Sequence, residues 1–224
     1  MNVGEDKGRI VTDLIAEVKP QTMVELGGYI GYSCILFGDA VKRAGGKRYY
    51  SLERNPEFAA VIGSLIDLAG LSDVVKIVVG SSDASIARLH AEGKLSDGVD
   101  LMFLDHYKPA YTTDLKLCED LGLIKPGRTV LAADNVIKPG NPPYLEYVRS
   151  SPAEKKAALE KAKANGVTVD ERFKDRTASQ YGKVESLANA AGVPELVYES
   201  KLVNSFEPTG VAVSSSLPIR PHGT

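Results

Sequence analysis

The amino-acid sequence predicts an α/β fold with a largely parallel sheet, and three observations support this prediction. From residue 10 onward, short runs of β-branched and aromatic residues alternate with amphipathic runs, as strands alternate with helices in such a fold. Several strand-like runs end on an acidic residue, and the carboxyl ends of parallel strands form the ligand-binding edge of an open sheet. The chain has 224 residues, of which 43% are hydrophobic and 25% charged, so we expect a single domain over residues 1–224 with one sizeable core.

The predicted elements follow from the spacing of apolar residues and from stop signals. Residues 10–18 carry apolar side chains at helical spacing, and the pair Lys19-Pro20 ends this run. Pro56 occupies the first turn of a later helix, where proline is tolerated. The same approach along the chain predicts strands at residues 23–26, 48–53, 74–79, 99–104 and 129–133, and helices at residues 10–18, 32–44, 56–71, 84–92 and 113–121.

The regular alternation stops after Tyr147. A possible N-cap, a first-turn proline and a capping acid at residues 151–154 begin a Lys- and Ala-rich helix that ends near residue 165. Another helix is expected around residues 183–190, so we expect residues 151–195 to form a solvent-exposed helical insertion, with a lid or a dimer contact as the alternative. Residues 196–203 and 211–215 return to a β pattern and predict a terminal antiparallel hairpin.

Charge and cysteine content exclude several classes of protein. The chain has 27 Lys and Arg against 29 Asp and Glu, a net charge of −2, so we expect neither nucleic acid nor a membrane as partner. No apolar run approaches the roughly 20 residues that span a bilayer, and no signal-peptide core is present, which favours a cytoplasmic protein. Cys34 and Cys118 are expected to be free buried thiols. We expect a monomer or a weak homodimer.

A glycine-rich loop follows the first predicted strand, with the sequence Glu25-Leu26-Gly27-Gly28-Tyr29-Ile30-Gly31. Glycines there let the backbone approach a ligand closely. The spacing is not G-x-G-x-x-G, which disfavours a dinucleotide and favours an adenosyl ligand without a pyrophosphate. Glu53 ends the second strand and would accept hydrogen bonds from ribose hydroxyls. A plain tight connection is the alternative for the loop, and Ser82-Asp83 would either contact the adenine or, through Asp83, cap a helix.

Two further acids end the fourth and fifth predicted strands. Asp105 and Asp134 would lie about 5 Å apart if these strands are neighbours, because that is the spacing of paired strands. Adding the carbonyl of Asn135 gives three hard oxygen ligands, which suit Mg²⁺. His106 as a ligand would indicate zinc or iron instead, although a hydrogen-bond donor near the cofactor is the more common role. A capping acid at 105 and an Asx turn at 134–135 are the alternatives without a metal.

At these residues the chain resembles the catechol O-methyltransferases. The resemblance covers roughly residues 1–149 and resumes more loosely at residues 198–207. The strings that carry it, in family order and spacing, are Met1-Asn2-Val3-Gly4, Glu25-Leu26-Gly27 with Gly31-Tyr32-Ser33, Asn55-Pro56, Phe103-Leu104-Asp105-His106, and Ala133-Asp134-Asn135-Val136-Ile137 followed by Pro139-Gly140.

This resemblance implies a Rossmann-like class I methyltransferase fold, with a seven-stranded, mostly parallel sheet, an antiparallel last strand and helices on both faces. It also implies S-adenosylmethionine and Mg²⁺ as cofactors and a catechol as the small-molecule substrate. The implied cofactor-binding residues are Val3, Glu25, Gly27, Tyr29, Ser33, Glu53, Arg54, Ser82, Asp83, Asp105, His106 and Tyr107. The implied Mg²⁺ ligands are Asp105, Asp134 and Asn135, and the implied substrate-binding residues are Lys108, Asn135, Pro139 and Glu207.

By the same resemblance, Lys108 is the general base and Glu207 holds the hydroxyl that is not methylated. The chain departs from the family pattern at Tyr107, where many relatives carry Trp, and at Arg54, where an apolar Met is common. Two other functions are kept as alternatives: a cation-dependent methyltransferase acting on a caffeoyl thioester or a hydroxylated nucleobase, and a non-catalytic module that binds S-adenosylmethionine.

Overall fold

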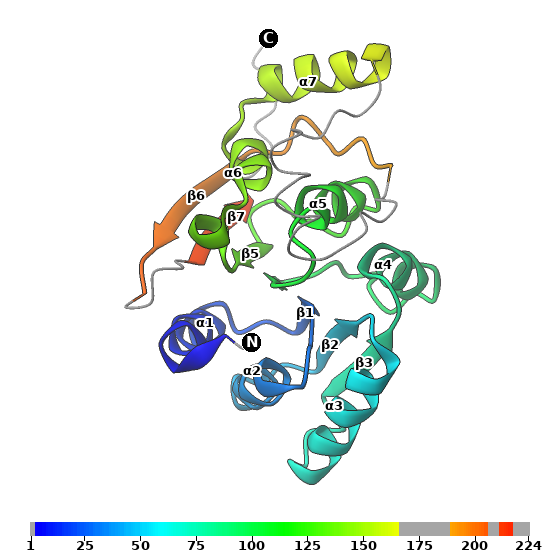
Figure 1. The fold of residues 1–224 in the computed structure, drawn as a ribbon, viewed down its shortest axis with the longest axis vertical. Coiled ribbons are helices and arrows are strands. Elements are labelled where there is room, and N and C mark those ends of the chain that lie inside the picture. Colours follow the sequence, from blue (N-terminus) through cyan, green and yellow to red (C-terminus); the bar gives the residue numbers. More distant parts are fainter. Residues whose placement is uncertain (1–2, 166–188, 206–210, 217–224) are drawn as a thin grey trace.

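One sheet runs through the protein, and its strands lie in the order β3-β2-β1-β4-β5-β7-β6 (Figure 1). The structure is a computed structural model that describes residues 3–165, 189–205 and 211–216. Strands β1 to β5 pair in parallel, whereas β7 is antiparallel to both β5 and β6. The strands are β1 (Thr22–Leu26), β2 (Arg48–Glu53), β3 (Val75–Val79), β4 (Leu101–Leu104), β5 (Val130–Ala133), β6 (Tyr198–Val203) and β7 (Val211–Ser216).

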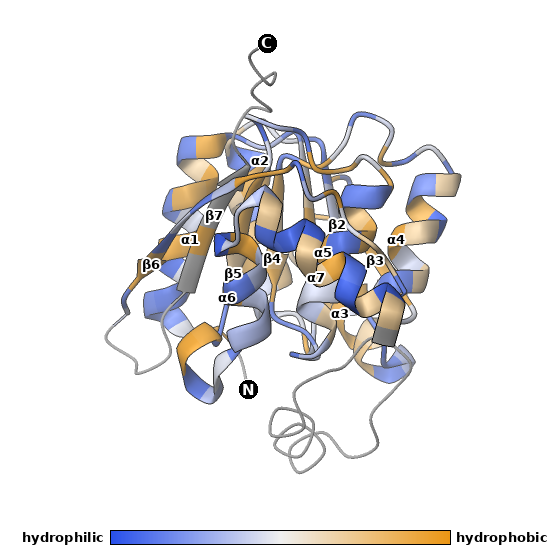
Figure 2. Cartoon of the chain, turned by 90° about the horizontal axis from the view of Figure 1, so that it is seen from above, coloured by the Kyte–Doolittle hydropathy of each residue, from blue (hydrophilic) through white to orange (hydrophobic). Residues whose placement is uncertain are grey.

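Helices cover both faces of the sheet. The helices are α1 (Gly4–Val18), α2 (Tyr32–Arg43), α3 (Pro56–Leu68), α4 (Ser82–Ala91), α5 (Ala110–Asp120), α6 (Pro142–Arg149) and α7 (Pro152–Asn165), and a π-helical turn spans Val136–Gly140. One buried cluster joins the sheet to α1, α2 and α3, and the other joins it to α4, α5 and α6. Helices such as α1 and α4 carry separate hydrophobic and hydrophilic stripes, as expected for helices with one side on a sheet (Figure 2).

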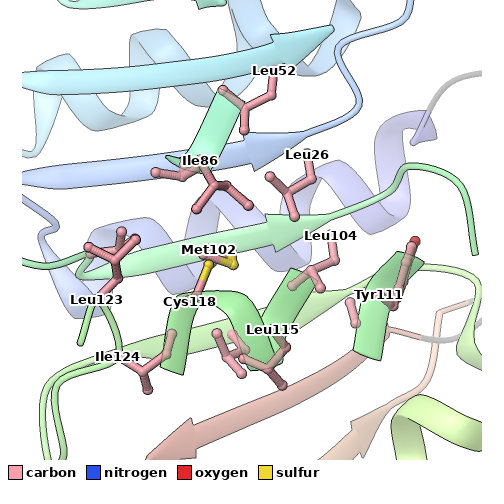
Figure 3. Packing of buried hydrophobic residues seen from close by; sticks show 14 of the residues in the cluster. Leu26, Leu52, Ile86, Met102, Leu104, Tyr111, Leu115, Cys118, Leu123 and Ile124 are labelled. Carbon is pink, nitrogen blue, oxygen red and sulfur yellow. The ribbon is translucent and has the colours of Figure 1, made fainter. Parts of the chain in front are cut away.

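The central strands are apolar on both sides because both of their faces are covered. Along β4, Met102 and Leu104 belong to the cluster with α4 to α6, whereas Leu101 and Phe103 belong to the cluster with α1 to α3. Figure 3 shows Leu104 beside its neighbours from adjacent strands and helices in the first of these clusters. Successive side chains of a strand point to opposite faces, so a strand buried on both sides is a continuous hydrophobic run.

The prediction of an α/β fold with parallel strands is confirmed, with some shifted boundaries. The first helix begins at Gly4 rather than residue 10, because residues 4–9 are too polar to show the helical spacing. Helix α6 was not predicted; Asn141 caps it by accepting a hydrogen bond from the Tyr144 N–H. The antiparallel pairing of β6 with β7 and the helix at 152–165 agree with the predictions. The predicted helix at 183–190 lies almost wholly outside the described residues.

A buried polar cluster attaches α7 and residues 189–197 to the ends of α5 and α6. Glu119 Oε2 accepts hydrogen bonds from the Tyr147 hydroxyl at 2.5 Å and the Val193 N–H at 2.7 Å, and Glu119 Oε1 accepts one from the Tyr198 hydroxyl at 2.6 Å. Lys155 lies over the Tyr147 ring, 4.4 Å from its centre. Tyr198 begins β6, so this cluster lies at the amino edge of the sheet.

Among the described residues, each helix is too short or too polar to cross a lipid bilayer.

Candidate functional site

The carboxyl ends of β1, β2, β4 and β5 bring the predicted site residues together. The loop after β1 contacts the ends of both neighbouring strands, β2 and β4. Leu104 of β4 pairs with Ala133 of β5, so Asp105 and Asp134 directly follow paired positions on adjacent strands. The edge where these loops meet is the usual ligand-binding edge of an open parallel sheet.

Gly27 allows the loop after β1 to approach the end of β4. Its φ is +94°, and a Cβ at this position would lie only 2.7 Å from the backbone oxygen of Asp105. Tyr29 also has a positive φ of 48°, and its exposed ring packs edge-on against Phe58 with centroids 5.2 Å apart. A side chain at position 27 is therefore excluded by both conformation and space, as expected for a loop that presents its backbone to a ligand.

Glu53 holds the same loop from the end of β2. Its Oε2 accepts a hydrogen bond from the Tyr29 N–H at 2.8 Å, and its Oε1 accepts one from the Asn55 N–H at 2.7 Å. Each carboxylate oxygen has a second lone pair that can accept another donor. An open cavity of about 500 Å³ lies here, lined by Glu53, Arg54, Asn55, Pro56 and Glu57. A ribose beside Glu53 is therefore compatible with this geometry.

Glu25 lies deeper than the loop, within β1, and is fully buried. Its Oε2 accepts hydrogen bonds from the Ser51 hydroxyl at 2.6 Å and the Cys34 thiol at 3.0 Å. Its Oε1 has no hydrogen-bond partner within the described part of the chain. Burial raises the pKa of Glu25, and burial also raises the pKa of the Cys34 thiol, with the charge of Glu25 adding to that effect. A buried acceptor of this kind fits a cationic donor such as the amino group of S-adenosylmethionine.

Asp105 and Asp134 are close enough to repel each other. Burial raises the pKa of Asp134, and the negative charge of Asp105 raises it further. Asp134 is 1% exposed, and its Oδ1 accepts a hydrogen bond from the Asn135 N–H at 2.6 Å. No group of three His, Cys, Asp or Glu side chains suited to a metal occurs in the ranges that the structure describes. Two carboxylates with one carbonyl oxygen of Asn135 are nevertheless a donor set that Mg²⁺ accepts.

A buried lysine lies against each of these two carboxylates. Lys108 Nζ lies 2.9 Å from Asp105 Oδ1 and donates a hydrogen bond to the Tyr111 hydroxyl at 2.7 Å. The Tyr111 hydroxyl in turn donates to the backbone oxygen of Asp134 at 3.3 Å. Lys7 of α1 donates to both oxygens of Asp134, at 2.7 and 3.0 Å. Each of the two acids thus has a lysine side chain as a close partner.

Sequence reasoning missed Lys7 and Tyr111. A signal for Lys7 exists, because Lys7, Val11 and Ile15 follow one another at intervals of four residues on the buried side of α1. Extending the apolar face of the predicted helix backward by one turn would have placed this lysine against the core. Tyr111 carries no comparable signal, because an aromatic residue in the first turn of a helix is ordinary.

His106 is held by contacts with α5. Its Nε2 lies 2.9 Å from Asp114 Oδ2, and its ring stacks on Tyr111 with centroids 4.8 Å apart and planes at 9°. Its Nδ1 is buried and has no hydrogen-bond partner among the described residues. Zinc or iron would need further His, Cys, Asp or Glu ligands beside His106, and the described residues contain no such group of three.

The other predicted residues have the following places. Val3 is buried at the start of α1, Ser33 lies in the first turn of α2, and Tyr107 is half-buried after β4. Ser82 and Asp83 form the first turn of α4, whose N-cap is Ser81, so the alternative that Asp83 caps this helix is wrong. Asp83 instead accepts a hydrogen bond from the adjacent Ala84 N–H at 2.8 Å. Pro139 lies in the π-helical turn after Asn135, and Glu207 lies outside the described residues.

Comparison with known proteins gives matches in sequence and in structure. A protein-family profile described as a methyltransferase domain matches residues 24–135, half of the chain. Catechol O-methyltransferase of Mus musculus is 43% identical over 151 residues, which cover 67% of this chain and 56% of that protein. Catechol O-methyltransferase of Sus scrofa is 42% identical over 149 residues, which cover 66% of this chain and 78% of that protein. The chain thus spans a little over half the length of several relatives that it matches.

The comparison of structures also gives a methyltransferase. The O-methyltransferase from Bacillus cereus, solved in complex with SAH, superposes with a TM-score of 0.64 and 19% identity, over 97% of this chain and 83% of that one. At this identity the likeness concerns the fold, and it agrees with the predicted Rossmann-like methyltransferase architecture. From its sequence relatives and the matching profile, the chain belongs to the family of methyltransferase-domain proteins that includes the catechol O-methyltransferases.

Proposed function

We propose that the chain transfers the methyl group of S-adenosylmethionine to one hydroxyl of a catechol bound with Mg²⁺. This reaction is supported by the relatives named catechol O-methyltransferase, whose matched region covers 67% of this chain. One structural observation carries the proposal: Asp105 and Asp134 follow adjacent strands, and the buried amine of Lys108 lies 2.9 Å from Asp105. A module that only binds S-adenosylmethionine needs no pair of repelling carboxylates beside a base.

The methyl donor is proposed to lie along the loop after β1. Gly27 and Tyr29 would face it with their backbone, and Glu53 would accept hydrogen bonds from its ribose hydroxyls. Glu25 Oε1, which has no partner in the described residues, would accept a hydrogen bond from its ammonium group. His106 Nδ1, which is buried without a partner in the described residues, would bind near the adenine. The remaining members of the proposed donor site are Val3, Ser33, Arg54, Ser82, Asp83, Asp105 and Tyr107.

Asp105, Asp134 and Asn135 would hold Mg²⁺ through two carboxylates and one carbonyl oxygen. When bound, Mg²⁺ would supply the positive charge that lowers the pKa of a chelated hydroxyl. Pro139 and Glu207 are proposed to border the substrate, with Glu207 accepting a hydrogen bond from the hydroxyl that is not methylated.

Lys108 is proposed to act in its neutral amine form, in which its Nζ atom can take the proton of the reacting hydroxyl. Its Nζ lies 2.9 Å from Asp105 Oδ1, a proposed metal ligand, so a diol bound there would be within its reach. The deprotonated oxygen then bonds to the methyl carbon while the bond between that carbon and the sulfonium sulfur breaks. Opposite charges are neutralised in this step, so the task of the protein is to align oxygen, carbon and sulfur and to exclude water.

The insertion at residues 151–195 is proposed to be a helical excursion that takes no part in the reaction. Val193 and Tyr198 bond to Glu119 at the amino edge of the sheet, and Lys155 of α7 bonds to the Leu196 oxygen there, whereas the acids lie at the carboxyl edge.

A methyl-transfer assay across three acceptors tests the proposed function. We expect turnover of catechol with Mg²⁺, its loss in EDTA and its return on adding Mg²⁺, and no turnover of a monophenol, which cannot chelate. Undiminished turnover of catechol in EDTA would contradict the metal assignment. Preference for a caffeoyl thioester would support the alternative of a cation-dependent methyltransferase that acts on such thioesters. Binding of S-adenosylmethionine without turnover of any of the three acceptors would support a non-catalytic binding module.

A further inference from the structure

The ion pair between Lys7 and Asp134 joins the first helix to the proposed metal site. Lys7 Nζ lies 2.7 Å from Asp134 Oδ2 and 3.0 Å from Asp134 Oδ1, across 127 positions of sequence. The two residues are 3% and 1% exposed. The pair therefore lies beneath the site, within the packed interior of the protein.

This pair is not explained by stability alone. Lys7 occupies the apolar side of α1 with Val11 and Ile15, where a hydrophobic residue would be expected. Burying two charges costs a desolvation free energy that their attraction often only offsets, and apolar replacements of a buried pair are often as stable. The presence of a lysine at this buried position is therefore connected with Asp134, one of the proposed ligands of the metal.

Each of the two proposed metal-binding acids is paired with a lysine before any divalent ion binds. Lys7 lies 2.7 Å from Asp134, and Lys108 lies 2.9 Å from Asp105. A divalent cation that enters must share Asp134 with Lys7 and must approach an ammonium group of like charge. A diol that binds as its monoanion, with its proton released to the solvent, would offset part of the positive charge that the metal adds.

We propose that Lys7 is a positioning residue that sets the affinity for Mg²⁺: its ammonium holds the Asp134 carboxylate and competes with the metal for it. Mg²⁺ then binds weakly alone and more tightly together with an acidic vicinal diol, because the anionic diol offsets part of the positive charge of the metal. By thermodynamic reciprocity, Mg²⁺ also binds the diol more tightly. This inference rests on the proposed metal site.

Calorimetric titration with Mg²⁺, in the absence of a methyl donor and with or without catechol, tests this inference. Lys7→Met should bind Mg²⁺ about tenfold more tightly than the wild type when catechol is absent, because a nearby like charge has gone. The increase in Mg²⁺ affinity caused by catechol should shrink in the same variant. Lys7→Arg keeps the charge and should keep the wild-type affinity and coupling.

Lys155→Met is the matched control. Lys155 is also buried, at 4% exposure, and donates to the backbone oxygen of Leu196 at 2.7 Å, but it lies at the amino edge. Both methionine variants should lower the melting temperature in EDTA, whereas only Lys7→Met should show a larger rise on adding Mg²⁺. If Lys7→Met does not fold, Lys7→Gln replaces it in every measurement.

The possible failures are distinguishable. Unchanged or weaker Mg²⁺ binding by a folded Lys7→Met or Lys7→Gln protein would overturn the role of Lys7 and leave the metal site standing. A wild-type chain that binds no Mg²⁺ with or without catechol would overturn the proposed metal site, and the inference with it.

Discussion

The Tyr111 hydroxyl lies 2.7 Å from Lys108 Nζ and 3.3 Å from the backbone oxygen of Asp134. This single side chain thereby connects the proposed base to the strand end that carries a proposed metal ligand. The ring of Tyr111 is separately fixed, since it is fully buried between His106 and Tyr144. The hydroxyl and the ring can therefore be tested apart.

Tyr111→Phe should lower kcat while leaving the affinity for S-adenosylmethionine near that of the wild type. The variant keeps the stacked ring and loses the hydrogen bond that orients Lys108, at a cost of about 1 kcal/mol, or a roughly fivefold to tenfold lower kcat. Steady-state kinetics with catechol, together with donor binding by calorimetry, measure the two effects. An unchanged kcat would show that Lys108 needs no support from Tyr111.

Lys108→Ala should reduce kcat by about a hundredfold or more, because general-base catalysis contributes at least this factor. Binding of S-adenosylmethionine should stay near the wild-type value. Lys47→Ala, at an exposed position, serves as the control and should change neither quantity. Equal loss of donor binding and turnover in Lys108→Ala would indicate a structural residue instead.

Gly27→Ala should destabilise the fold by about 1–3 kcal/mol and weaken binding of the methyl donor, because alanine is strained at positive φ. Its Cβ would also meet the Asp105 backbone oxygen at 2.7 Å. Gly63→Ala in α3 is the matched control: no atom lies within 4 Å of its Cβ, and it should stabilise the helix by roughly 0.5–1 kcal/mol. Urea unfolding and calorimetry measure both variants, and equal stability changes would contradict the proposed tight approach.

Glu119→Gln should reduce the dependence of stability on pH. Burial raises the pKa of Glu119 above 4.5, so the folded protein holds this proton where the unfolded chain has released it. The contribution of Glu119 to stability is present below about pH 4.5 and is lost as the pH rises through the higher folded pKa. Urea unfolding at a series of pH values should show that the variant loses less stability than the wild type as the pH rises.

Glu154→Gln is the control for that experiment, because the contribution of Glu154 to stability changes with pH in the opposite direction. Hydrogen bonds from Ser151 lower the pKa of Glu154, so its contribution is present above the unfolded pKa of about 4.5 and is lost as the pH falls. Activity should survive in Glu119→Gln, because Glu119 lies at the edge opposite the acids. A pH dependence equal to that of the wild type would show that Glu119 does not titrate as its burial implies.

The sequence predicts those parts of the fold and site that depend on local pattern. The alternation of strands and helices, the helix at 152–165 and the neighbouring positions of Asp105 and Asp134 all follow from spacing, caps and strand ends. Lys7 and Glu119 act through partners 127 and up to 79 positions away, and no local pattern encodes such pairings. The start of the first helix was missed because its first turns are polar.

The segment between Lys155 and Leu196 leaves the body of the protein and returns to it at one place. Its two ends meet, because Lys155 Nζ bonds to the Leu196 oxygen at 2.7 Å and Lys156 pairs with Glu195 at 2.9 Å. Once the ends of a loop are held together, doubling its length costs only about 0.6 kcal/mol in closure entropy. The length of chain between these ends can therefore change at a small cost in closure entropy, as long as Val193 keeps its hydrogen bond to Glu119.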